Sequence, residues 1–454
     1  MHPLEPLSAD EITKAAEIFG HDGLIARIVL DEPTKDELAA SNGAAPERRA
    51  AITMVPGPGA GVLEAIVSLT DESVVSVDHI PDVRPALLFE DSINAIVAVM
   101  GSEEFAAALR KRGIDDLEKV QLDPWPAGTF GIAHEEGRRI TRVIAYLRDE
   151  PTDNGYAKPI EGLVAFVDMG KGEVLEVADY GVVPIPEDKG SYALADNGPA
   201  RTDLKPLEIT QPEGPSFTLD GHHLQWQKWS LRIAMDPYEG LVLHDVSIAG
   251  RSVAHRMSIS EMVVPYGDPG PMHGWKNAFD AGEWGLGRMV NSLELGCDCL
   301  GEIRYLDAVF ADEHGNPQVH ANAVCIHEED YGILWKHWDM QGGTTEVRRS
   351  RRLVVSSIST VGNYEYGFYW YFYLDGTIQL EVKLTGIMST MAAESKPSHA
   401  SMVAPGLAAP YHQHMFCARL DMDVDGANNE VYEVDVLPDP EAADNAFKPQ
   451  ATRL

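Results

Sequence analysis

The sequence predicts a mainly β protein in which two small α+β domains precede a large antiparallel β-sandwich domain. Three observations lead to this fold class. A helix followed by several strands is expected twice before residue 185, a linker-like segment comes next, and closely spaced strand signals then continue to residue 454 with little helical periodicity. A chain of 454 residues is also too long for one hydrophobic core, so two to four domains are expected.

The first small domain is expected over residues 1–85. Ser8 and Glu11 have the spacing of a capping box, and the amphipathic residues after them predict a short helix. Runs rich in β-branched residues then predict strands at 50–55, 61–69 and 73–80.

The second small domain is expected over residues 86–185. Helical periodicity covers 92–99 and 103–112, and strands are predicted at 139–149, 162–169 and 172–181. Neither small domain contains a residue pattern that indicates chemistry, so both are expected to be structural.

Residues 186–215 are rich in Pro, Gly, Asp and Lys, which is typical of a linker. The sandwich domain is expected over 216–454. Its most informative stretch runs from Thr360 to Gly376, a dense aromatic run that ends in Asp375-Gly376, a strong hairpin signal. This pattern predicts that Tyr364 lies at the start of a hairpin strand.

The charge balance excludes some partners. Acidic residues number 71 and basic residues 36, for a net charge of −35, which argues against binding to nucleic acid or to an anionic membrane and favours cationic ligands such as amines. The one dense basic cluster, Arg348, Arg349, Arg351 and Arg352, is expected to be a solvated or ion-paired strand end. No apolar run approaches the ~20 residues of a membrane span, and the acidic first residues favour a cytoplasmic protein.

His412 and His414 are separated by one residue. Two histidines at this spacing in a strand point to the same face, where they suit a single metal ion. The four cysteines are Cys297, Cys299, Cys325 and Cys417, and composition alone indicates reduced thiols in the core.

The residues Thr360-Val361-Gly362-Asn363-Tyr364-Glu365, followed by His412-Gln413-His414, resemble the signature of the copper amine oxidases. The resemblance extends over nearly the whole chain, including 261–269 and 292–299. It implies two small domains ahead of a catalytic sandwich that also builds a homodimer, a Cu(II) ion held by both histidines, and conversion of Tyr364 to the topaquinone cofactor. The implied reaction oxidises a primary amine with O₂ and water to aldehyde, ammonia and hydrogen peroxide.

The resemblance also implies roles for individual residues. Asp280 would abstract the α-proton of the bound amine, Tyr266 would hydrogen-bond the cofactor oxygen, Asn363 would limit rotation of the quinone, and Glu365 would support it. In strands and loops, each of these residue types is by itself more often structural than functional. The roles therefore depend on the resemblance.

Two further features follow from the resemblance. Cys299 and Cys325 would form a disulfide. Asp421, the carbonyl of Met422 and Asp423 would contribute to a secondary calcium or manganese site, for which a solvated acidic turn is the alternative.

The family's third histidine ligand lies far beyond the His-x-His pair, and residues 415–454 contain no histidine. We therefore expect a fragment of a longer protein, or a truncated homologue.

Two other classes of function stay open. One is an inactive homologue or fragment that acts only as a binding module, and the other is a metal-binding sandwich without a quinone.

Overall fold

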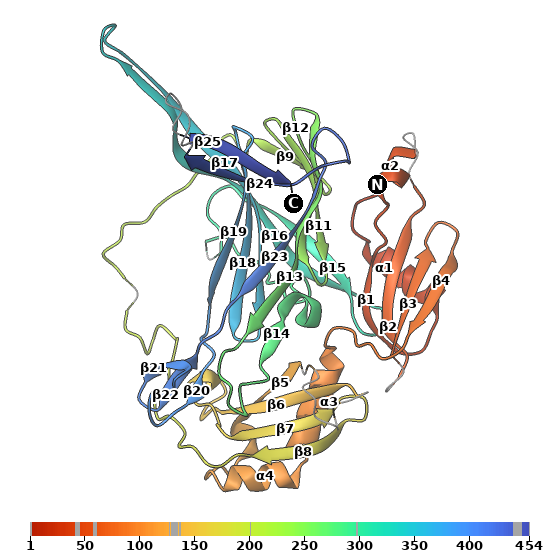
Figure 1. The fold of residues 1–454 in the computed structure, drawn as a ribbon, viewed down its shortest axis with the longest axis vertical. Coiled ribbons are helices and arrows are strands. Elements are labelled where there is room, and N and C mark those ends of the chain that lie inside the picture. Colours follow the sequence, from red (N-terminus) through yellow and green to blue (C-terminus); the bar gives the residue numbers. More distant parts are fainter. Residues whose placement is uncertain are drawn as a thin grey trace.

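The structure is a computed structural model that describes residues 2–40, 46–57, 61–126, 128, 135, 138–199, 201–296, 298–438 and 447–453, with backbone alone for 437–438 and 447–453. Two small α+β units and a large two-sheet β unit follow one another along the chain (Figure 1). The predicted fold class is confirmed. Within the described residues, no single helix is long and apolar enough to span a membrane, although α3 and α4, bent by 63°, pass that test as a pair.

The first unit is a four-stranded antiparallel sheet, β1-β2-β3-β4, with a helix packed on it. The capping box forms as predicted, since Ser8 Oγ accepts from Glu11 N at 3.2 Å and Glu11 accepts from Ser8 N at 2.9 Å. The strand β1 was not predicted. The elements are α1 (Ala9–Phe19), β1 (Leu24–Leu30), α2 (Lys35–Ala40), β2 (Arg49–Val55), β3 (Val62–Ser68) and β4 (Ser73–Ile80).

The second unit packs two helices against the sheet β5-β6-β7-β8 around a core that includes Val99, Phe105 and Leu163. The sequence pattern missed β5, which carries two prolines and lies at the sheet edge, where proline is tolerated. The elements are α3 (Phe89–Met100), α4 (Glu103–Arg110), η1 (Leu117–Lys119), β5 (Val120–Pro126), β6 (Ile140–Leu147), η3 (Gly155–Ala157), β7 (Leu163–Asp168) and β8 (Glu173–Asp179).

No helix or strand occurs among the described residues of 180–216, which run as an extended segment between the second unit and the sandwich (Figure 1).

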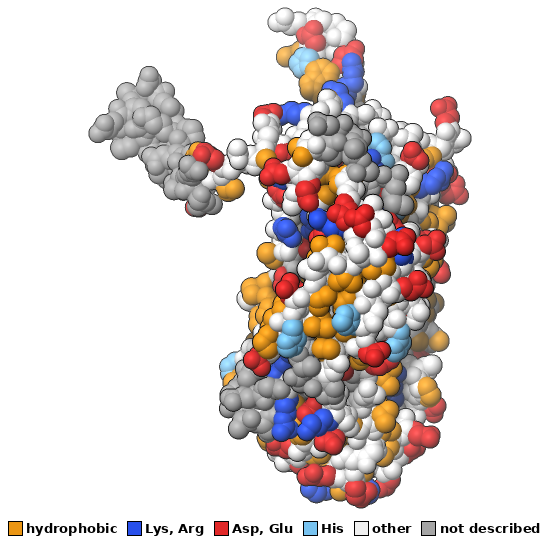
Figure 2. Space-filling view, turned by 90° about the vertical axis from the view of Figure 1, so that its right-hand side faces the viewer, with side chains coloured by type: hydrophobic (Ala, Val, Ile, Leu, Met, Phe, Trp, Pro, Cys, Tyr) orange, Lys and Arg blue, Asp and Glu red, His pale blue; other side chains and the backbone are white. Residues whose placement is uncertain are grey.

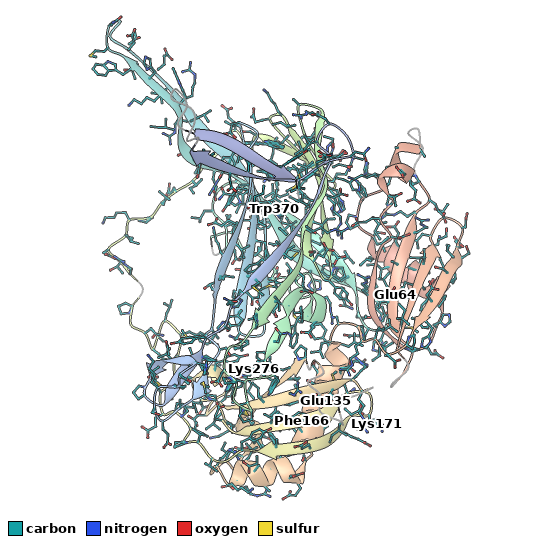
Figure 3. The ribbon with its side chains drawn as sticks, in the orientation of Figure 1. Glu64, Glu135, Phe166, Lys171, Lys276 and Trp370 are labelled. Carbon is teal, nitrogen blue, oxygen red and sulfur yellow. The ribbon has the colours of Figure 1, made fainter. Side chains whose placement is uncertain are left out.

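Two antiparallel sheets form the sandwich. The first has the order β14-β13-β12-β11-β10-β9, with β23 also paired to β13, and the second has the order β15-β16-β17-β18-β19. Buried residues from both sheets, including Trp226, Leu243, Leu353 and Trp370, form a shared core (Figure 3). The elements of this region and of the following short sheets are β9 (Phe217–Asp220), β10 (His223–Trp226), β11 (Trp229–Asp236), β12 (Gly240–Ile248), β13 (Arg251–Pro265), β14 (Asn277–Phe279), η4 (Asp280–Trp284), β15 (Arg304–Ala311), β16 (Pro317–Asp339), β17 (Thr344–Val361), β18 (Tyr364–Tyr373), β19 (Ile378–Gly386), β20 (Met391–Ala392), β21 (Ala400–Ala404), β22 (Leu407–Pro410), β23 (Met415–Met422), β24 (Tyr432–Pro438) and β25 (Phe447–Arg453).

The aromatic run forms β18, and Tyr364 is its first residue, as predicted. Val361 pairs with Tyr364 across the two-residue loop Gly362-Asn363, in which Gly362 adopts φ +59°, as the twist of such a hairpin requires. At the other end, the turn that contains Asp375-Gly376 leads into β19. Strand pairs on both sides therefore hold Tyr364 rigidly.

The ends of β16 and β17 project from the body as a long hairpin arm, residues 330–349, seen at the upper left of Figure 1 and the top of Figure 2. Trp335, Trp338 and Met340 on this arm are exposed, Met340 at 76%. The basic cluster lies at its base, where Arg352 Nε donates to Glu329 at 2.7 Å and Arg349 Nε donates to Asp330 at 3.0 Å. The expected ion pairing is confirmed, but the cluster lies inside β17 and not at a strand end.

Candidate active site

A cavity of about 160 Å³ lies where the sandwich meets the second small unit. Residues from β5, η3, β13, η4 and the start of β18 contribute to its wall. The lining residues are Asp123, Pro124, Trp125, Tyr156, Val264, Tyr266, Ala278, Asp280, Trp284, Val361, Gly362, Asn363 and Tyr364.

The structure brings Tyr364 together with Tyr266 and His412. The Tyr364 hydroxyl lies 3.1 Å from that of Tyr266 and 2.9 Å from Nε2 of His412. Tyr266 and His412 meet because β13 and β23 are antiparallel neighbours, so that the residue after β13 faces the segment before β23. Burial raises the pKa of the Tyr364 phenol, and the hydroxyl is therefore protonated at neutral pH.

Asn363 and Glu365 flank Tyr364 and are bound to different neighbours. Asn363 Nδ2 donates to the carbonyl of Ile387 at 2.6 Å, and Ile387 N donates to the Asn363 carbonyl at 2.7 Å. Glu365 accepts from Thr360 Oγ1 at 2.7 Å and from Asn291 Nδ2 at 3.1 Å. Both residues fix the strand at the point where Tyr364 enters the cavity.

Asp280 is the first residue of η4, and it is 3% exposed. Burial raises the pKa of Asp280 to about 7, the nearby charge of Glu261 adds to this shift, and a hydrogen bond from the Tyr366 hydroxyl at 2.8 Å opposes it. A carboxylate with a pKa near neutrality, in the same cavity as Tyr364, is suited to accept a proton from a bound ligand.

His412 and His414 were predicted to lie within a strand, and this is wrong. His412 forms an isolated bridge to Tyr266, and β23 begins only at Met415, because the chain must first leave β22 and cross to the edge of β13. The two rings nevertheless lie side by side, with centroids 4.9 Å apart.

In both histidines Nε2 is the unprotonated nitrogen, and Nε2 of His412 accepts from the Tyr364 hydroxyl at 2.9 Å. Nδ1 of His412 lies 2.9 Å from the Pro410 carbonyl, which can only accept, so Nδ1 carries the proton. Nδ1 of His414 lies 3.1 Å from the Tyr366 oxygen, whose own proton goes to Asp280, so Nδ1 is again the donor. Burial lowers the pKa of His414 to about 4, which keeps that ring neutral.

These properties fit copper. Neutral imidazoles oriented by a hydrogen bond at the other nitrogen are favoured Cu(II) ligands. In the described part of the chain, one trio of His, Cys, Asp or Glu side chains has ligand atoms within 4.8 Å of one another, and it is Cys299, Cys325 and His327. No described His, Cys, Asp or Glu side chain therefore forms such a trio with His412 and His414.

Sequence reasoning missed Tyr366, a fully buried residue that links Asp280 to His414. Its position was available in principle, because residues i and i+2 of a strand share a face and Tyr366 follows Tyr364 by two. The aromatic run hid it among several tyrosines.

For the second small unit, the expectation of a purely structural role is wrong. Asp123, Trp125 and Tyr156 of the second unit line the cavity, and the Lys276 ammonium lies 4.9 Å from the centroid of the Trp125 ring (Figure 3). No sequence signal connects these residues to Tyr364, because the sheets of two different units bring them together.

The cysteines differ in part from expectation. Cys299 and Cys325 are buried free thiols rather than the disulfide that the resemblance implied, and Cys417 is exposed on β23 at the open side of its sheet instead of in the core. Cys297 lies outside the described residues. The Cys299 and Cys325 sulfurs lie within 4.8 Å, so the packing brings the pair together without a covalent bond.

Asp421 and Met422 are the last two residues of β23, and Asp423 follows the strand. Lys35 of α2 donates to Asp421 Oδ1 at 2.6 Å and to the Met422 carbonyl at 3.4 Å, while Asp423 accepts from Ser252 at 2.8 Å. An ammonium group thus lies against two of the groups predicted to bind a secondary cation.

Comparisons with known proteins agree with this geometry. The chain matches the family models for the copper amine oxidase enzyme domain over residues 218–453, the copper amine oxidase N3 domain over 91–193 and an AGAO-like N2 domain over 7–77. It is 46% identical over 461 residues to the primary amine oxidase of Arthrobacter sp. (strain P1), covering 98% of this chain and 71% of that relative. It is 49% identical over 475 residues to the histamine oxidase of Arthrobacter globiformis, covering 100% and 69%. Among solved structures, a copper-containing benzylamine oxidase from Hansenula Polymorpha superposes with a TM-score of 0.90 at 31% identity, covering 100% of this chain and 76% of that one.

Proposed function

This chain belongs to the copper amine oxidase family, and we propose that it oxidises primary amines with O₂ and water to aldehyde, ammonia and hydrogen peroxide. The observation that carries the proposal is one arrangement of three groups. The Tyr364 hydroxyl lies 2.9 Å from Nε2 of His412 and shares its cavity with Asp280.

His412 and His414 would hold copper through Nε2, and Tyr364 is the residue that would become topaquinone. When present, the metal and the quinone supply O₂ chemistry, an electrophilic carbonyl and a store for two electrons, none of which ordinary side chains provide.

The residues of the chain supply position and proton transfer. Asp280 accepts the α-proton of the bound amine, and Tyr366 orients that carboxylate through its 2.8 Å hydrogen bond. Tyr266 donates to the Tyr364 oxygen, and Asn363 with Ile387 holds the backbone on the other side. Apolar walls at Trp125, Val264 and Trp284 exclude water, which strengthens these polar contacts.

One observation favours a second candidate function. Among the described residues, no His, Cys, Asp or Glu side chain joins His412 and His414 as a third ligand, and without tight copper binding the same cavity would act as an amine-binding module with no turnover. The experiment below separates the two.

Copper-loaded, aerated protein should bind about one phenylhydrazine per functional site and develop the colour of a hydrazone, because a quinone made from Tyr364 has a reactive carbonyl. Tyr364→Phe removes the phenol and should abolish both the colour and amine oxidation. Tyr369→Phe, a control tyrosine outside the cavity on the same strand, should leave both unchanged. If the wild-type protein with copper shows no hydrazone, the oxidase function is lost and the binding-module alternative stands.

We also propose a homodimer built through the hairpin arm. Exposed apolar side chains on a projecting hairpin, Trp335, Trp338 and Met340 among them, are a typical signature of a protein–protein contact. Wild-type protein should sediment as a dimer, and a Trp335→Ser, Trp338→Ser double variant should shift the species toward monomer. A wild-type monomer, or a variant that dimerises as tightly, would contradict the proposal.

Three smaller proposals remain. The Cys299–Cys325 disulfide requires oxidation of two adjacent thiols, which a reducing compartment opposes, and mass spectrometry without reductant would detect it. A cytoplasmic location is supported by the exposed thiol of Cys417, which suits a reducing compartment, and cell fractionation would test it. The secondary calcium or manganese site would have to displace Lys35, so a thermal shift on adding either ion should appear mainly in Lys35→Ala.

A further inference from the structure

We propose that the cavity has a second binding position at Asp123, which takes the distal cation of an amine that is positively charged at both ends, the simplest case being an aliphatic diamine. This inference rests on the proposed function, since the near end of the same molecule would lie between Tyr364 and Asp280.

The charges of the cavity wall support this assignment. Asp123 and Asp280 are its two charged side chains, and no Lys, Arg or His is among the described residues that line it. The two carboxylates come from different units, Asp123 from β5 and Asp280 from η4. Apolar residues, including Pro124, Val264 and Ala278, make up much of the remaining wall, and a chain of methylene groups could pack against them.

Asp123 is held ready to bind a ligand. Gln121 Nε2 donates to Oδ1 at 2.8 Å and the Tyr156 hydroxyl donates to Oδ2 at 2.9 Å, so both oxygens are fixed in place. A carboxylate has about four lone-pair positions, so two neutral donors leave acceptor capacity unused. Asp123 is a partly exposed residue that lines the cavity, which fits a carboxylate that faces the cavity.

The surroundings of Asp123 make a cationic ligand favourable. Burial raises the pKa of Asp123, which means that its charge is poorly compensated, although the two hydrogen bonds and the more distant Lys276 and Arg148 lower the pKa in part. Lys276 does not line the cavity, and its charge is shared among three acids, Glu161, Asp123 and Asp268. An ammonium group at Asp123 would add the charged partner that the two neutral donors do not provide.

A monoamine of the same length would place a methyl group at this position and leave the carboxylate without a charged partner. Diamine and monoamine should therefore differ in binding. The loss of a charge-assisted hydrogen bond of this kind corresponds to roughly 10- to 100-fold in affinity.

Binding to copper-free protein with unmodified Tyr364 provides the test, because it does not require turnover. By calorimetry, putrescine should bind at least tenfold more tightly than butylamine to the wild-type protein. Asp123→Asn keeps an oxygen acceptor for its neighbours while it removes the charge, and it should bring the two dissociation constants to within a factor of about two to three. Glu118→Gln makes the same change at an exposed acid just before β5 and should leave the wild-type ratio intact.

Either of two results would overturn the inference. One is equal affinity of the wild-type protein for the two amines, and the other is a preference for putrescine that survives in Asp123→Asn. Absence of a phenylhydrazine-reactive quinone would defeat the oxidase proposal without altering this ratio, so the two failures are distinguishable. In protein that does turn over, Asp123→Asn should lower kcat/KM for putrescine by the same factor and leave kcat/KM for butylamine within about twofold.

Discussion

Asp280→Asn should lower kcat for amine oxidation by roughly 10²- to 10⁴-fold, the range expected when a positioned general base is removed. The substitution keeps the size of the side chain and an acceptor for the Tyr366 hydroxyl, but an amide cannot take a proton at neutral pH. Phenylhydrazine should still titrate the variant fully. If the variant keeps the normal number of phenylhydrazine-reactive carbonyls but no longer turns over, the defect lies in proton transfer and not in formation of the quinone.

Glu283 is the matched control for this experiment. Burial raises the pKa of Glu283 to about 7, the same value as for Asp280, and it lies three residues further along η4. Glu283 does not line the cavity, and its carboxylate instead accepts from Phe279 N at 2.8 Å. Glu283→Gln should therefore lower kcat by less than about tenfold. If Asp280→Asn turned over at the wild-type rate, or Glu283→Gln lost as much, Asp280 would not be the base.

The raised pKa of Asp280 also sets the direction of the pH dependence. The base must be ionised to work, so kcat/KM should fall as the pH decreases through about 7, by about tenfold per pH unit once the carboxyl is protonated. Because burial and the charge of Glu261 both raise this pKa, Glu261→Gln should shift the acidic limb of the profile to lower pH.

The sequence predicts the parts of this molecule that depend on local pattern. Capping at Ser8, three strands in each small unit and the hairpin start at Tyr364 all follow from residues that are neighbours in the chain. The family resemblance adds Asp280 and Tyr266, which no local rule would select from among many acids and tyrosines. The structure then brings both into the cavity with Tyr364.

What sequence pattern misses depends on contacts between units. Asp123 and Tyr156 reach the cavity because the sheet of the second unit packs beside η4 and β18, and no periodicity in β5 reports this. The two prolines within β5, which lies at the sheet edge, also hid the strand itself. The histidine pair illustrates a second limit. Alternation within a strand correctly predicts that the two imidazole rings are neighbours, but it does not reveal that both histidines lie just before β23 and not within it.

His412→Ala should remove copper binding and, with it, every phenylhydrazine-reactive carbonyl, which makes it the most severe single substitution in the site. The imidazole has three contacts that alanine cannot replace. It donates through Nδ1 to the Pro410 carbonyl, accepts through Nε2 from the Tyr364 hydroxyl, and stacks on Tyr266 with centroids 4.7 Å apart. Loss of one of the two described nitrogen ligands should lower copper affinity by at least ~10- to 100-fold, which is the loss seen when only a residue that hydrogen-bonds a metal ligand is changed.

Copper content after dialysis, measured by elemental analysis, gives the direct readout, and the visible spectrum after aeration gives the second. His399→Ala is the control, because His399 is an exposed histidine close in sequence that contacts only Ser398 through its side chain in the described structure. It should retain the wild-type copper content and colour. If His412→Ala kept one copper per chain and still formed the quinone, the metal would have to be bound elsewhere, and the link between the histidine pair and Tyr364 would be broken.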